Sequence, residues 1–401
     1  MKDNINKKRI LIAVIVAVFI IATIIVNVIK DSIEYKNDLT LNENLNAEFD
    51  TEEKVSDFIK ELKGTIVDDY KIETTSLGEK EIEFKYKNLH GWKKKKKFKI
   101  NIIDTVAPVT YIESNFTVVK GYNKDLTEVV LSGDNCDPNP TRKIIGDYDF
   151  NKVGKYDLTF EISDASNNVT RKDFTLNVIE ASKSNNATQT VKKTKFTDVT
   201  SNYKKTNTEF GIDVSEWQGD IDWDKVKESG CDFTFIRVGY QNGFDGENKE
   251  DKYFKQNIEN AKKSGIDNIG IYFYSYAKTT QEAEEQANWV KEELKDYEIN
   301  LPVVFDWESW SSFNKCKLSF FDINNIAKTF NKVLEDNGYQ TMLYSSKTYL
   351  EKIWYADIFE NIWLAQYNSK VTYKEKYQYW QMSNTGKIDG INGDVDIDIK
   401  Y

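Results

Sequence analysis

The chain has 401 residues, enough for two or three domains, and a formal net charge of −10 at pH 7. This acidic balance argues against nucleic acid as the main partner, because phosphate binding draws on a basic surface. With one histidine, His90, and three scattered cysteines without CxxC spacing, the sequence offers no zinc site, no disulfide framework and no histidine-based catalytic triad.

An apolar run near the start of the chain predicts a membrane segment. Residues 10–29 are almost entirely apolar and long enough to cross a hydrocarbon core of about 30 Å. Three basic side chains lie directly before the run: Lys7, Lys8 and Arg9. By the positive-inside rule we expect residues 1–9 in the cytoplasm and everything after Lys30 outside the cell, as a single-pass protein of the cell membrane. No small-x-small cleavage site follows the run, so we favour an uncleaved signal anchor, with a cleaved signal peptide as the alternative.

The next 150 residues contain a repeat. LGEKEIEFKYKNLHGWKKKKKFKINIID from Leu77 and VGKYDLTFEISDASNNVTRKDFTLNVIE from Val153 align without a gap at an offset of 76 residues, 153 − 77. Each copy contains alternating apolar and polar residues in two runs joined by a polar turn, which is typical of a β-hairpin. We therefore predict two antiparallel β-sandwich modules, at residues 30–104 and 105–180.

The second copy resembles the bacterial immunoglobulin-like modules of surface proteins. The resemblance rests on DTVAP at residues 104–108 and on five spaced positions: Gly154, Tyr156, Phe160, Asp164 and Asn168. It implies a spacer, with wall or secretion-apparatus proteins as candidate partners. The first copy departs more and carries the basic run Lys93–Lys97, which is most often a solvated strand edge. Contact of this run with anionic wall polymers is the alternative.

Strand-like and helix-like segments alternate in the C-terminal half. Residues 181–208 are rich in Ser, Thr, Asn and Lys and are predicted to be a linker. In residues 209–401, eight strand-like segments follow one another: FGIDVS, FTFIRVGY, IGIYFYSYA, LPVVFDWE, TMLYSS, NIWLAQY, YQYWQMS and DVDIDIKY. Helical patterns separate most of them and fade toward the end, which predicts an irregular closed (β/α) barrel.

Carboxylates gather where these strands end. VVFDWESW, residues 303–310, places Asp306 and Glu308 two residues apart, on one face of an extended chain. Asp213 ends the first strand motif, and three more acids alternate along the last: Asp394, Asp396 and Asp398. Closure of the barrel brings these strands to one mouth, and repulsion there keeps at least one carboxyl protonated, as glycosidic bond cleavage requires. A solvated pair, a cation site or a helix cap would explain an isolated DxE equally well.

Four segments resemble the family 25 lysozymes, which are N-acetylmuramidases: GIDVSEWQGDIDWDKVKESGCDFTFIRVGY, IGIYFYSYA, LPVVFDWE and WQMSNTGKIDGINGDVDID. The resemblance covers residues 209–401 and implies Glu308 as proton donor, Asp306 as second carboxylate, and Asp213 and Asp396 as supporting acids. Phe273 and Asp398 depart from the family, which often has His and Asn at these positions. No metal and no cofactor is expected.

A sugar cleft also needs aromatic and hydrogen-bonding side chains. The candidates, each with barrel core as its alternative, are Tyr272, Tyr274, Tyr276, Tyr367, Trp380 and Gln381, with Trp363 beside them. Two mechanisms stay open: attack by the substrate's 2-acetamido group assisted by Asp306, or direct action of Asp306 as nucleophile or base. The sequence thus predicts a membrane-anchored muramidase that acts on the glycan strands of peptidoglycan. A non-catalytic wall-binding scaffold is the alternative, and a chitinase is weaker because its DxxDxDxE signature is absent.

Overall fold

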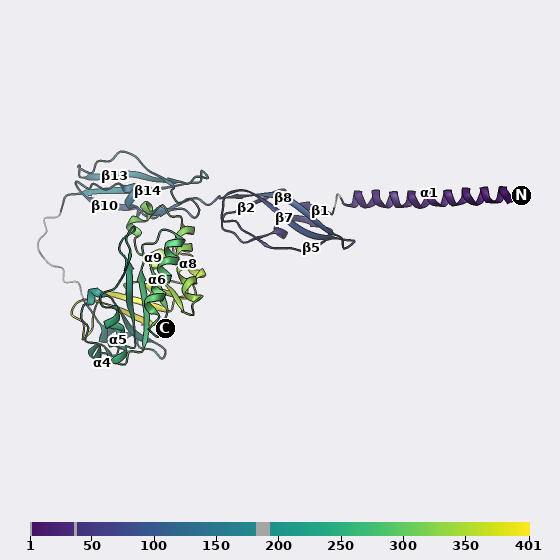
Figure 1. Cartoon of the computed structure of the whole chain (residues 1–401). Coiled ribbons are helices and arrows are strands. Elements are labelled where there is room, and N and C mark those ends of the chain that lie inside the picture. Colours follow the sequence, from purple (N-terminus) through teal and green to yellow (C-terminus); the bar gives the residue numbers. More distant parts are fainter. Residues whose placement is uncertain (1, 36–37, 182–192) are drawn as a thin grey trace. The chain divides into compact units, whose positions relative to one another are not determined.

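The computed structural model describes residues 2–35, 38–181 and 193–401 (Figure 1). The chain divides into two compact units, Met1–Thr105 and Val106–Tyr401. An N-terminal apolar helix and a C-terminal eight-stranded barrel confirm the predicted multidomain layout in outline.

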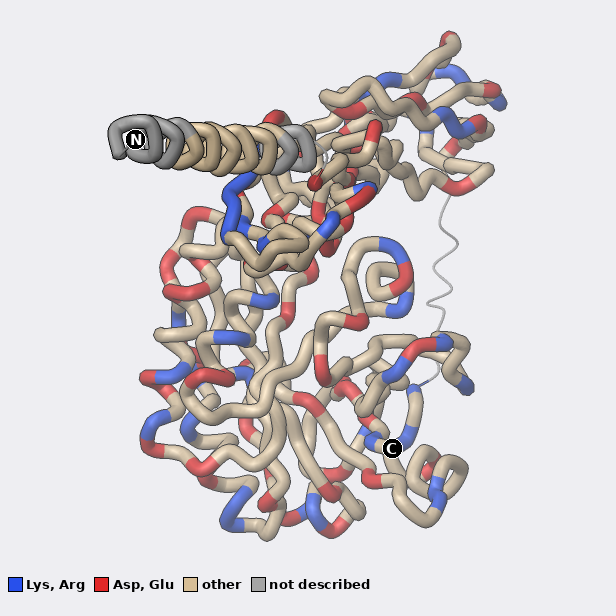
Figure 2. Tube along the Cα trace, turned by 90° about the vertical axis from the view of Figure 1, so that its right-hand side faces the viewer, with Lys and Arg blue, Asp and Glu red and all other residues tan. Residues whose placement is uncertain are grey.

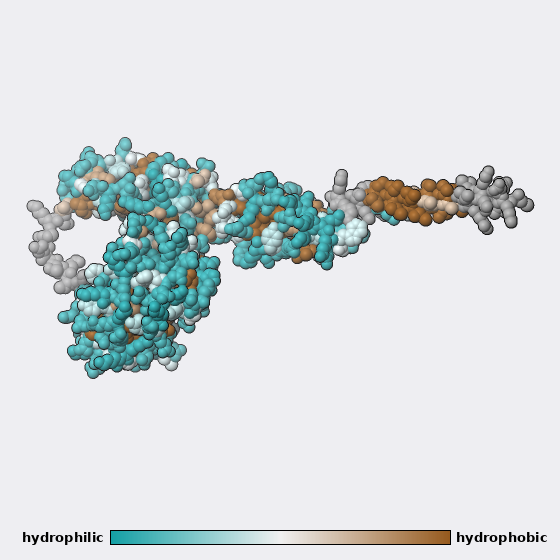
Figure 3. Space-filling model, viewed as in Figure 1, coloured by the Kyte–Doolittle hydropathy of each residue, from teal (hydrophilic) through white to brown (hydrophobic). Residues whose placement is uncertain are grey.

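The N-terminal helix α1 (Lys2–Tyr35) contains the predicted apolar run. Its segment Ile12–Ile29 is long and apolar enough to cross a membrane, and its side chains are exposed (Figure 3). A cleaved signal sequence would meet the same criteria of length and composition. Residues 10 and 11 of the predicted anchor and the basic cluster at residues 7–9 lie outside the side chains that the structure describes.

The first β module is built around a long hairpin. Its elements are β1 (Leu39–Leu41), β2 (Asn46–Glu48), β3 (Glu53–Lys54), η1 (Val55–Phe58), β4 (Ile59–Leu62), β5 (Gly64–Ile66), β6 (Lys71–Ile72), β7 (Gly78–Asn88) and β8 (Lys93–Ile103). The main sheet has the order β2-β8-β7-β5, and β1-β4 and β3-β6 form two further pairs. The alternating inward residues of β7 and β8, among them Phe84 and Phe98, form a core of the module's own.

The second β module repeats this hairpin. Its elements are β9 (Val109–Thr110), β10 (Asn115–Val119), α2 (Leu126–Val129), β11 (Ser132–Gly133), β12 (Thr141–Ile145), β13 (Gly154–Ser163) and β14 (Val169–Ile179). Gly78 pairs with Ile102 in the first module, and Gly154 pairs with Val178 in the second, so the offset of 76 residues, 154 − 78 and 178 − 102, holds in the strand register.

The expectation of purely antiparallel modules is wrong in one respect. In each module one short strand pairs in parallel with the second strand of the hairpin: β2 with β8, and β10 with β14. Long connections separate these strands along the chain, and parallel pairing requires such connections.

The basic run of the first module lies on β8, opposite acidic residues of β7. Four cross-strand ion pairs join the two strands: Lys95–Glu83, Lys97–Glu81, Lys97–Glu83 and Lys99–Glu79. These side chains are solvent-exposed, so water and salt screen the pairs and each contributes little to stability. The positions of these lysines agree with a solvated strand edge.

On the barrel, basic and acidic residues are also interspersed (Figure 2).

Part of the predicted linker is folded. Residues 182–192 lie outside the described residues, but Thr194–Lys195 (β15) pairs with the barrel and Phe196–Tyr203 (α3) follows as a helix. The segment is rich in Ser and Thr, which favours a linker, but Phe196 and Val199 lie one helical turn apart and are both buried in the barrel core. The linker prediction of residues 181–208 is therefore wrong from residue 194 onward.

The C-terminal domain is a closed barrel of eight strands. They are β16 (Glu209–Val214), β17 (Phe233–Gln241), β19 (Asn268–Tyr274), β20 (Val303–Asp306), β21 (Thr341–Ser346), β22 (Ile362–Ala365), β23 (Tyr379–Lys387) and β24 (Val395–Lys400). The short strand β18 (Asn248–Glu250) pairs with β17 outside this ring. The surrounding helical elements are η2 (Glu216–Gln218), α4 (Trp223–Glu228), α5 (Phe254–Lys263), α6 (Thr280–Leu294), η3 (Trp310–Ser312), α7 (Phe313–Cys316), α8 (Phe320–Glu335), α9 (Lys347–Leu350) and η4 (Ala356–Ile358).

The last strand closes the barrel against the direction of the others. From β16 to β23 neighbouring strands are parallel, whereas β24 is antiparallel to both β16 and β23. The connection from β23 to β24 is too short for a crossover, so the chain turns back as a hairpin. The first residues of β24 therefore lie at the same end of the barrel as the carboxyl ends of the parallel strands, which places Asp396 opposite Asp213.

Two cores follow from the alternation of side chains along the strands. Val304 belongs to a small cluster rich in aromatic residues inside the barrel, whereas Val303 and Phe305 belong to the large cluster between strands and helices. Cys231 is also buried in the large cluster, and Cys316 is partly buried against it.

Candidate active site

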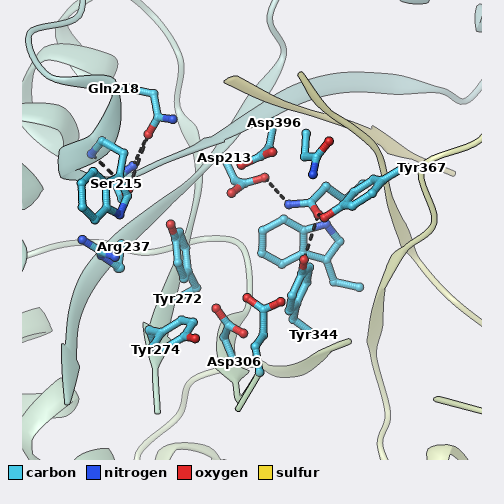
Figure 4. Close-up of a pocket in the computed structure, with 15 residues that line it drawn as sticks. Asp213, Ser215, Gln218, Arg237, Tyr272, Tyr274, Asp306, Tyr344, Tyr367 and Asp396 are labelled. Carbon is cyan, nitrogen blue, oxygen red and sulfur yellow. Dashed lines mark hydrogen bonds between the residues drawn. The ribbon is translucent and has the colours of Figure 1, made fainter. Parts of the chain in front are cut away.

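A polar cavity of about 270 Å³ opens at the carboxyl ends of the parallel strands (Figure 4). Its walls come from strands β16, β17, β19, β20, β21, β22, β23 and β24 and from the loops after them. The lining residues are Asp213, Ser215, Trp217, Gln218, Arg237, Tyr272, Tyr274, Asp306, Glu308, Tyr344, Trp363, Tyr367, Gln381, Asn384 and Asp396. All four predicted catalytic acids are among them.

The first pair of acids comes from the end of β20. Alternation along this strand sends Val304 and Asp306 into the barrel, and Phe305 and Trp307 into the outer core. Asp306 is only 4% exposed, and its Oδ1 atom has no hydrogen-bond partner among the described residues. Glu308, beyond the strand, is exposed to the cavity. One carboxyl is thus held inside the wall, while the other is accessible to a ligand.

Both acids of this pair have raised pKa values. Burial raises the pKa of Asp306 well above its usual range, and the neighbouring charges of Glu308 and Asp213 raise it further, against the opposing effect of Arg237. Burial also raises the pKa of Glu308, although its hydrogen bond to Asp306 acts in the opposite direction. Two like charges this close share a proton, so the pair offers one protonated and one ionised carboxyl near neutral pH.

The second group of acids lies across the cavity from Asp306, on β16 and β24 (Figure 4). Burial raises the pKa of Asp213 and, together with the charges of Asp213 and Glu308, raises that of Asp396 to about 9. Asp398 is fully buried; its Oδ1 accepts a hydrogen bond from Trp363 Nε1 at 2.8 Å, and burial raises its pKa as well. Asp394, the fourth acid of this strand region, is exposed and paired with Lys193 and Lys387 instead.

Gln381 on β23 connects this second group to two tyrosines. Its Nε2 donates to Asp213 Oδ2 at 2.8 Å, and its Oε1 accepts from Tyr344 at 2.8 Å and from Tyr367 at 2.9 Å. A flipped amide would place Nε2 against the two phenol groups and Oε1 against the carboxylate, so these three bonds favour one orientation of the Gln381 amide and hold Asp213 and both phenol groups with it.

Arg237 supplies positive charge at the wall formed by β17. Its guanidinium donates to Asp251 at 2.7 Å and to Glu216 at 2.9 Å. These two carboxylates hold the Arg237 side chain in place and neutralise part of its charge. On the same side Trp217 is 81% exposed, so a large aromatic surface stands at the rim of the cavity.

Four of the six predicted sugar-binding residues line the cavity: Tyr272, Tyr274, Tyr367 and Gln381. Tyr276 does not line it; the ring follows the end of β19 and packs against Tyr274 and Phe244. The prediction of Trp380 as a sugar-binding residue is wrong. Trp380 alternates with Gln381 along β23, so it faces the outer core, where it is 1% exposed and donates to Gln366 O at 2.8 Å.

Six lining residues were not predicted as site residues: Ser215, Trp217, Gln218, Arg237, Tyr344 and Asn384. Alternation in TMLYSS could have indicated Tyr344, since it shares a face with Met342. Trp217 lies in η2, and Asn384 lies in the part of β23 where the register against β24 shifts, so a simple two-residue period identifies neither of them.

The two departures from the family pattern differ in consequence. Phe273 faces away from the cavity and packs on Trp289 and Phe330, so it does not alter the lining. Asp398 is buried next to Trp363, and burial raises its pKa, which favours the uncharged form and so reduces the difference from the asparagine common at this position.

Comparison with known proteins agrees with this geometry. Residues 212–391 match the family model described as Glycosyl hydrolases family 25. The barrel is thus similar to the family 25 glycosyl hydrolases over residues 212–391. The chain is accordingly a glycoside hydrolase.

Curated relatives align with the same region. The uncharacterized protein YegX of Escherichia coli strain K12 is 26% identical over 194 residues, which cover 47% of this chain and 68% of YegX. The autolytic lysozyme of Clostridium acetobutylicum is 26% identical over 191 residues, covering 47% of this chain and 54% of the lysozyme.

Among solved structures, the modular autolysin LytC from Streptococcus pneumoniae, in complex with a synthetic peptidoglycan ligand, aligns at 27% identity with a TM-score of 0.44. The alignment covers 61% of this chain and 56% of LytC. The glycosyl hydrolase chain thus spans little more than half the length of LytC and of the C. acetobutylicum lysozyme.

Proposed function

We propose that the protein is a muramidase that hydrolyses the β-1,4 bond between N-acetylmuramic acid and N-acetylglucosamine in peptidoglycan. One observation supports this most: a cavity-exposed Glu308 next to a buried Asp306 whose Oδ1 lacks a hydrogen-bond donor. Family 25 relatives named as lysozymes support the same substrate.

In this proposal Glu308 is the general acid. Burial raises the pKa of Glu308, which favours its protonated form, and its exposure lets the carboxyl reach the glycosidic oxygen. Loss of the leaving group leaves positive charge at the anomeric carbon, which the ionised carboxyl of the Asp306–Glu308 pair stabilises.

Asp306 acts on the substrate's 2-acetamido group. The unpartnered Oδ1 accepts the acetamido N–H, and this polarises the amide so that its carbonyl oxygen attacks the anomeric carbon. The free acceptor favours this route over direct attack, because a buried acceptor without a donor is costly until a ligand supplies one. Water then opens the cyclic intermediate, with Glu308 as the base, and the product retains its anomeric configuration.

Digestion of purified peptidoglycan tests the proposal. After borohydride reduction, mass spectrometry of the fragments should find muramic acid at the new reducing ends. Glucosamine at the reducing ends would contradict the muramidase proposal, and the absence of any release of fragments would favour a wall-binding scaffold.

We further propose that α1 anchors the protein in the membrane, and that the two β modules are immunoglobulin-like and hold the hydrolase domain on the wall side. The apolar length of α1 and the 76-residue repeat support this arrangement. Protease added to whole cells should remove the hydrolase domain and leave a small membrane-bound stub. A free ectodomain in the medium that begins near residue 30 would indicate cleavage instead.

A further inference from the structure

The second β module contacts the hydrolase domain at one particular segment, the stretch that follows Glu308. We call residues 309–321 the post-catalytic segment; it contains η3, α7 and the first residues of α8. The module contributes residues 127–135, which run from α2 through β11 and are called the junction loop below. Both lie in the compact unit Val106–Tyr401.

Asn314 in α7 binds the backbone of the junction loop through both ends of its amide. Its Nδ2 lies 3.1 Å from Thr127 O, 3.3 Å from Glu128 O and 2.8 Å from Val130 O. Its Oδ1 accepts a hydrogen bond from Ser132 N at 3.3 Å. The Asn314 side chain thus provides hydrogen-bond partners for backbone groups of the junction loop that regular secondary structure would otherwise satisfy.

The junction loop also completes the start of α8. The first N–H groups of a helix have no partner within the helix. Here Phe320 N donates to Asp134 O at 2.8 Å, and Phe321 N donates to Asn135 O at 3.2 Å. The module therefore provides acceptors for two donors of the hydrolase domain.

Packing at Gly133 leaves no room for a side chain. A Cβ atom there would lie 2.7 Å from Phe320 Cε1 and 3.2 Å from Phe313 Cε1. Arg142 holds this part of the junction loop from within the module, donating to the hydroxyl and the carbonyl of Ser132. The junction is close-packed as well as hydrogen-bonded.

The post-catalytic segment is connected to Glu308 through Trp310. The backbone N–H of Trp310 donates to Glu308 O at 2.8 Å. The Trp310 ring stacks on Tyr349 with centroids 4.1 Å apart and meets the edge of Trp307 at 4.8 Å. Phe313 packs against both tryptophans and against Phe320 at the junction. A continuous set of rigid rings therefore extends from the Gly133 contact to the backbone of the catalytic loop.

We propose that the second β module positions Glu308 by fixing the post-catalytic segment, in addition to any role as a spacer. This inference rests on the proposed function, in which Glu308 is the general acid. Displacement of a catalytic group by about 1 Å can cost up to about 100-fold in rate. The residues that transmit the effect, Asn314 and Gly133, are positioning residues, because neither lines the cavity.

Asn314→Ala in the full-length protein tests the inference. We expect kcat on soluble glycan strands to fall about ten-fold with KM within about two-fold of wild type, because substrate contacts remain intact. The alkaline limb of the pH–rate profile should also shift, since the surroundings of the Glu308 carboxyl change. The matched control is Asn337→Ala, which removes an asparagine in the turn after α8 whose Nδ2 donates to Val333 O within the same domain.

Gly133→Ala is the second variant, with Gly154→Ala as its control in the same module. A Cβ at Gly154 meets nothing closer than 3.7 Å, so this substitution should leave kcat unchanged. If Asn314→Ala does not fold, Asn314→Ser replaces it, because serine keeps a short polar side chain at this position but cannot reach all of the backbone groups that the amide contacts. Hydrogen exchange across residues 309–321 should increase in the junction variants alone.

The outcomes separate the two proposals. Unchanged kcat and pH profile in Asn314→Ala and Gly133→Ala, with active wild-type protein, would overturn the positioning role and leave the muramidase proposal intact. Wild-type protein without activity on peptidoglycan would overturn the muramidase proposal, and with it the role of the junction in catalysis. Increased exchange in the junction variants would then still show that the junction holds residues 309–321 in place.

Discussion

The two groups of carboxylates in the cavity have similar charge and very different surroundings. Asp306 and Glu308, at the end of β20, include a buried oxygen without a donor and a carboxyl exposed to the cavity. Asp213 and Asp398, by contrast, accept hydrogen bonds from Gln381 and Trp363. Asp398 Oδ2 also lacks a partner among the described residues, but Asp398 is fully buried and does not line the cavity. The unpartnered oxygen of the first group, by contrast, belongs to a residue that lines the cavity beside the exposed Glu308.

This difference indicates separate roles for groups that composition alone cannot distinguish. A carboxyl that takes part in a reaction needs an oxygen that is not already occupied by hydrogen bonds to the protein. Carboxyls that accept fixed hydrogen bonds shape the cavity and set its electrostatic potential. The four predictions that follow test this division, beginning with the largest expected effect.

Glu308→Gln should reduce kcat by about 10²- to 10⁴-fold, the usual contribution of general acid catalysis, while the protein stays folded. Glutamine keeps the size of the side chain but has no proton to give. The alkaline limb of the pH–rate profile should disappear, because in the wild type the rate falls as pH rises through the raised pKa of Glu308. Rates of peptidoglycan hydrolysis between pH 4 and 10 would measure this. Near-normal activity would place the acid in the second group.

Asp306→Asn should reduce kcat by about 100-fold and remove the acidic limb, because the amide cannot orient the acetamido N–H as a carboxylate does. With wild-type protein, a substrate that carries a hydroxyl in place of the 2-acetamido group should be almost inert. Efficient hydrolysis of that substrate would favour Asp306 as a direct nucleophile or base.

Asp396→Asn should change the pH dependence of stability more than the chemistry. The folded-state pKa of Asp396, about 9, lies above its ordinary value of about 3.9. Between these values the folded protein holds a proton that the unfolded chain has lost, so the free energy of unfolding falls as pH rises. Denaturant titrations from about pH 5 to 9 should show a shallower fall in the variant. An identical slope would mean that Asp396 is ionised in the folded protein.

Trp217→Ala should have the smallest effect, a rise in KM of a few-fold at unchanged kcat. The exposed ring stands at the rim, where it offers a surface for a sugar without touching the reacting bond. Steady-state kinetics on soluble glycan strands would measure it. A fall in kcat alone would place Trp217 in contact with the transition state.

The acids of the site were predictable because they lie on strands. A two-residue period and the closure of a barrel are enough to bring Asp213, Asp306 and Asp396 to one mouth. The same period was misapplied to Trp380, which is one residue from Gln381 and therefore faces the other way. Arg237, whose position depends on Asp251 and Glu216, needed tertiary contacts that no local pattern encodes.

The fold was also predictable only in part. The hairpins of both β modules followed from alternation and from the repeat, but the parallel strands β2 and β10 did not, because their partners are distant in sequence. The helix α3 was not predicted because its surroundings are polar in composition and only two residues of the helix, Phe196 and Val199, are buried. The contact between the junction loop and α7 depends on backbone carbonyls, and these carry no sequence signal.

The buried cysteines have a consequence for the environment in which the protein works. Burial raises the pKa of Cys231 to about 12 and that of Cys316 to about 11. Thiol–disulfide exchange requires the thiolate, and at neutral pH almost none forms at either position. The hydrolase domain is thus held together by packing and hydrogen bonds rather than cross-links, and its shape should be indifferent to whether its surroundings are oxidising or reducing.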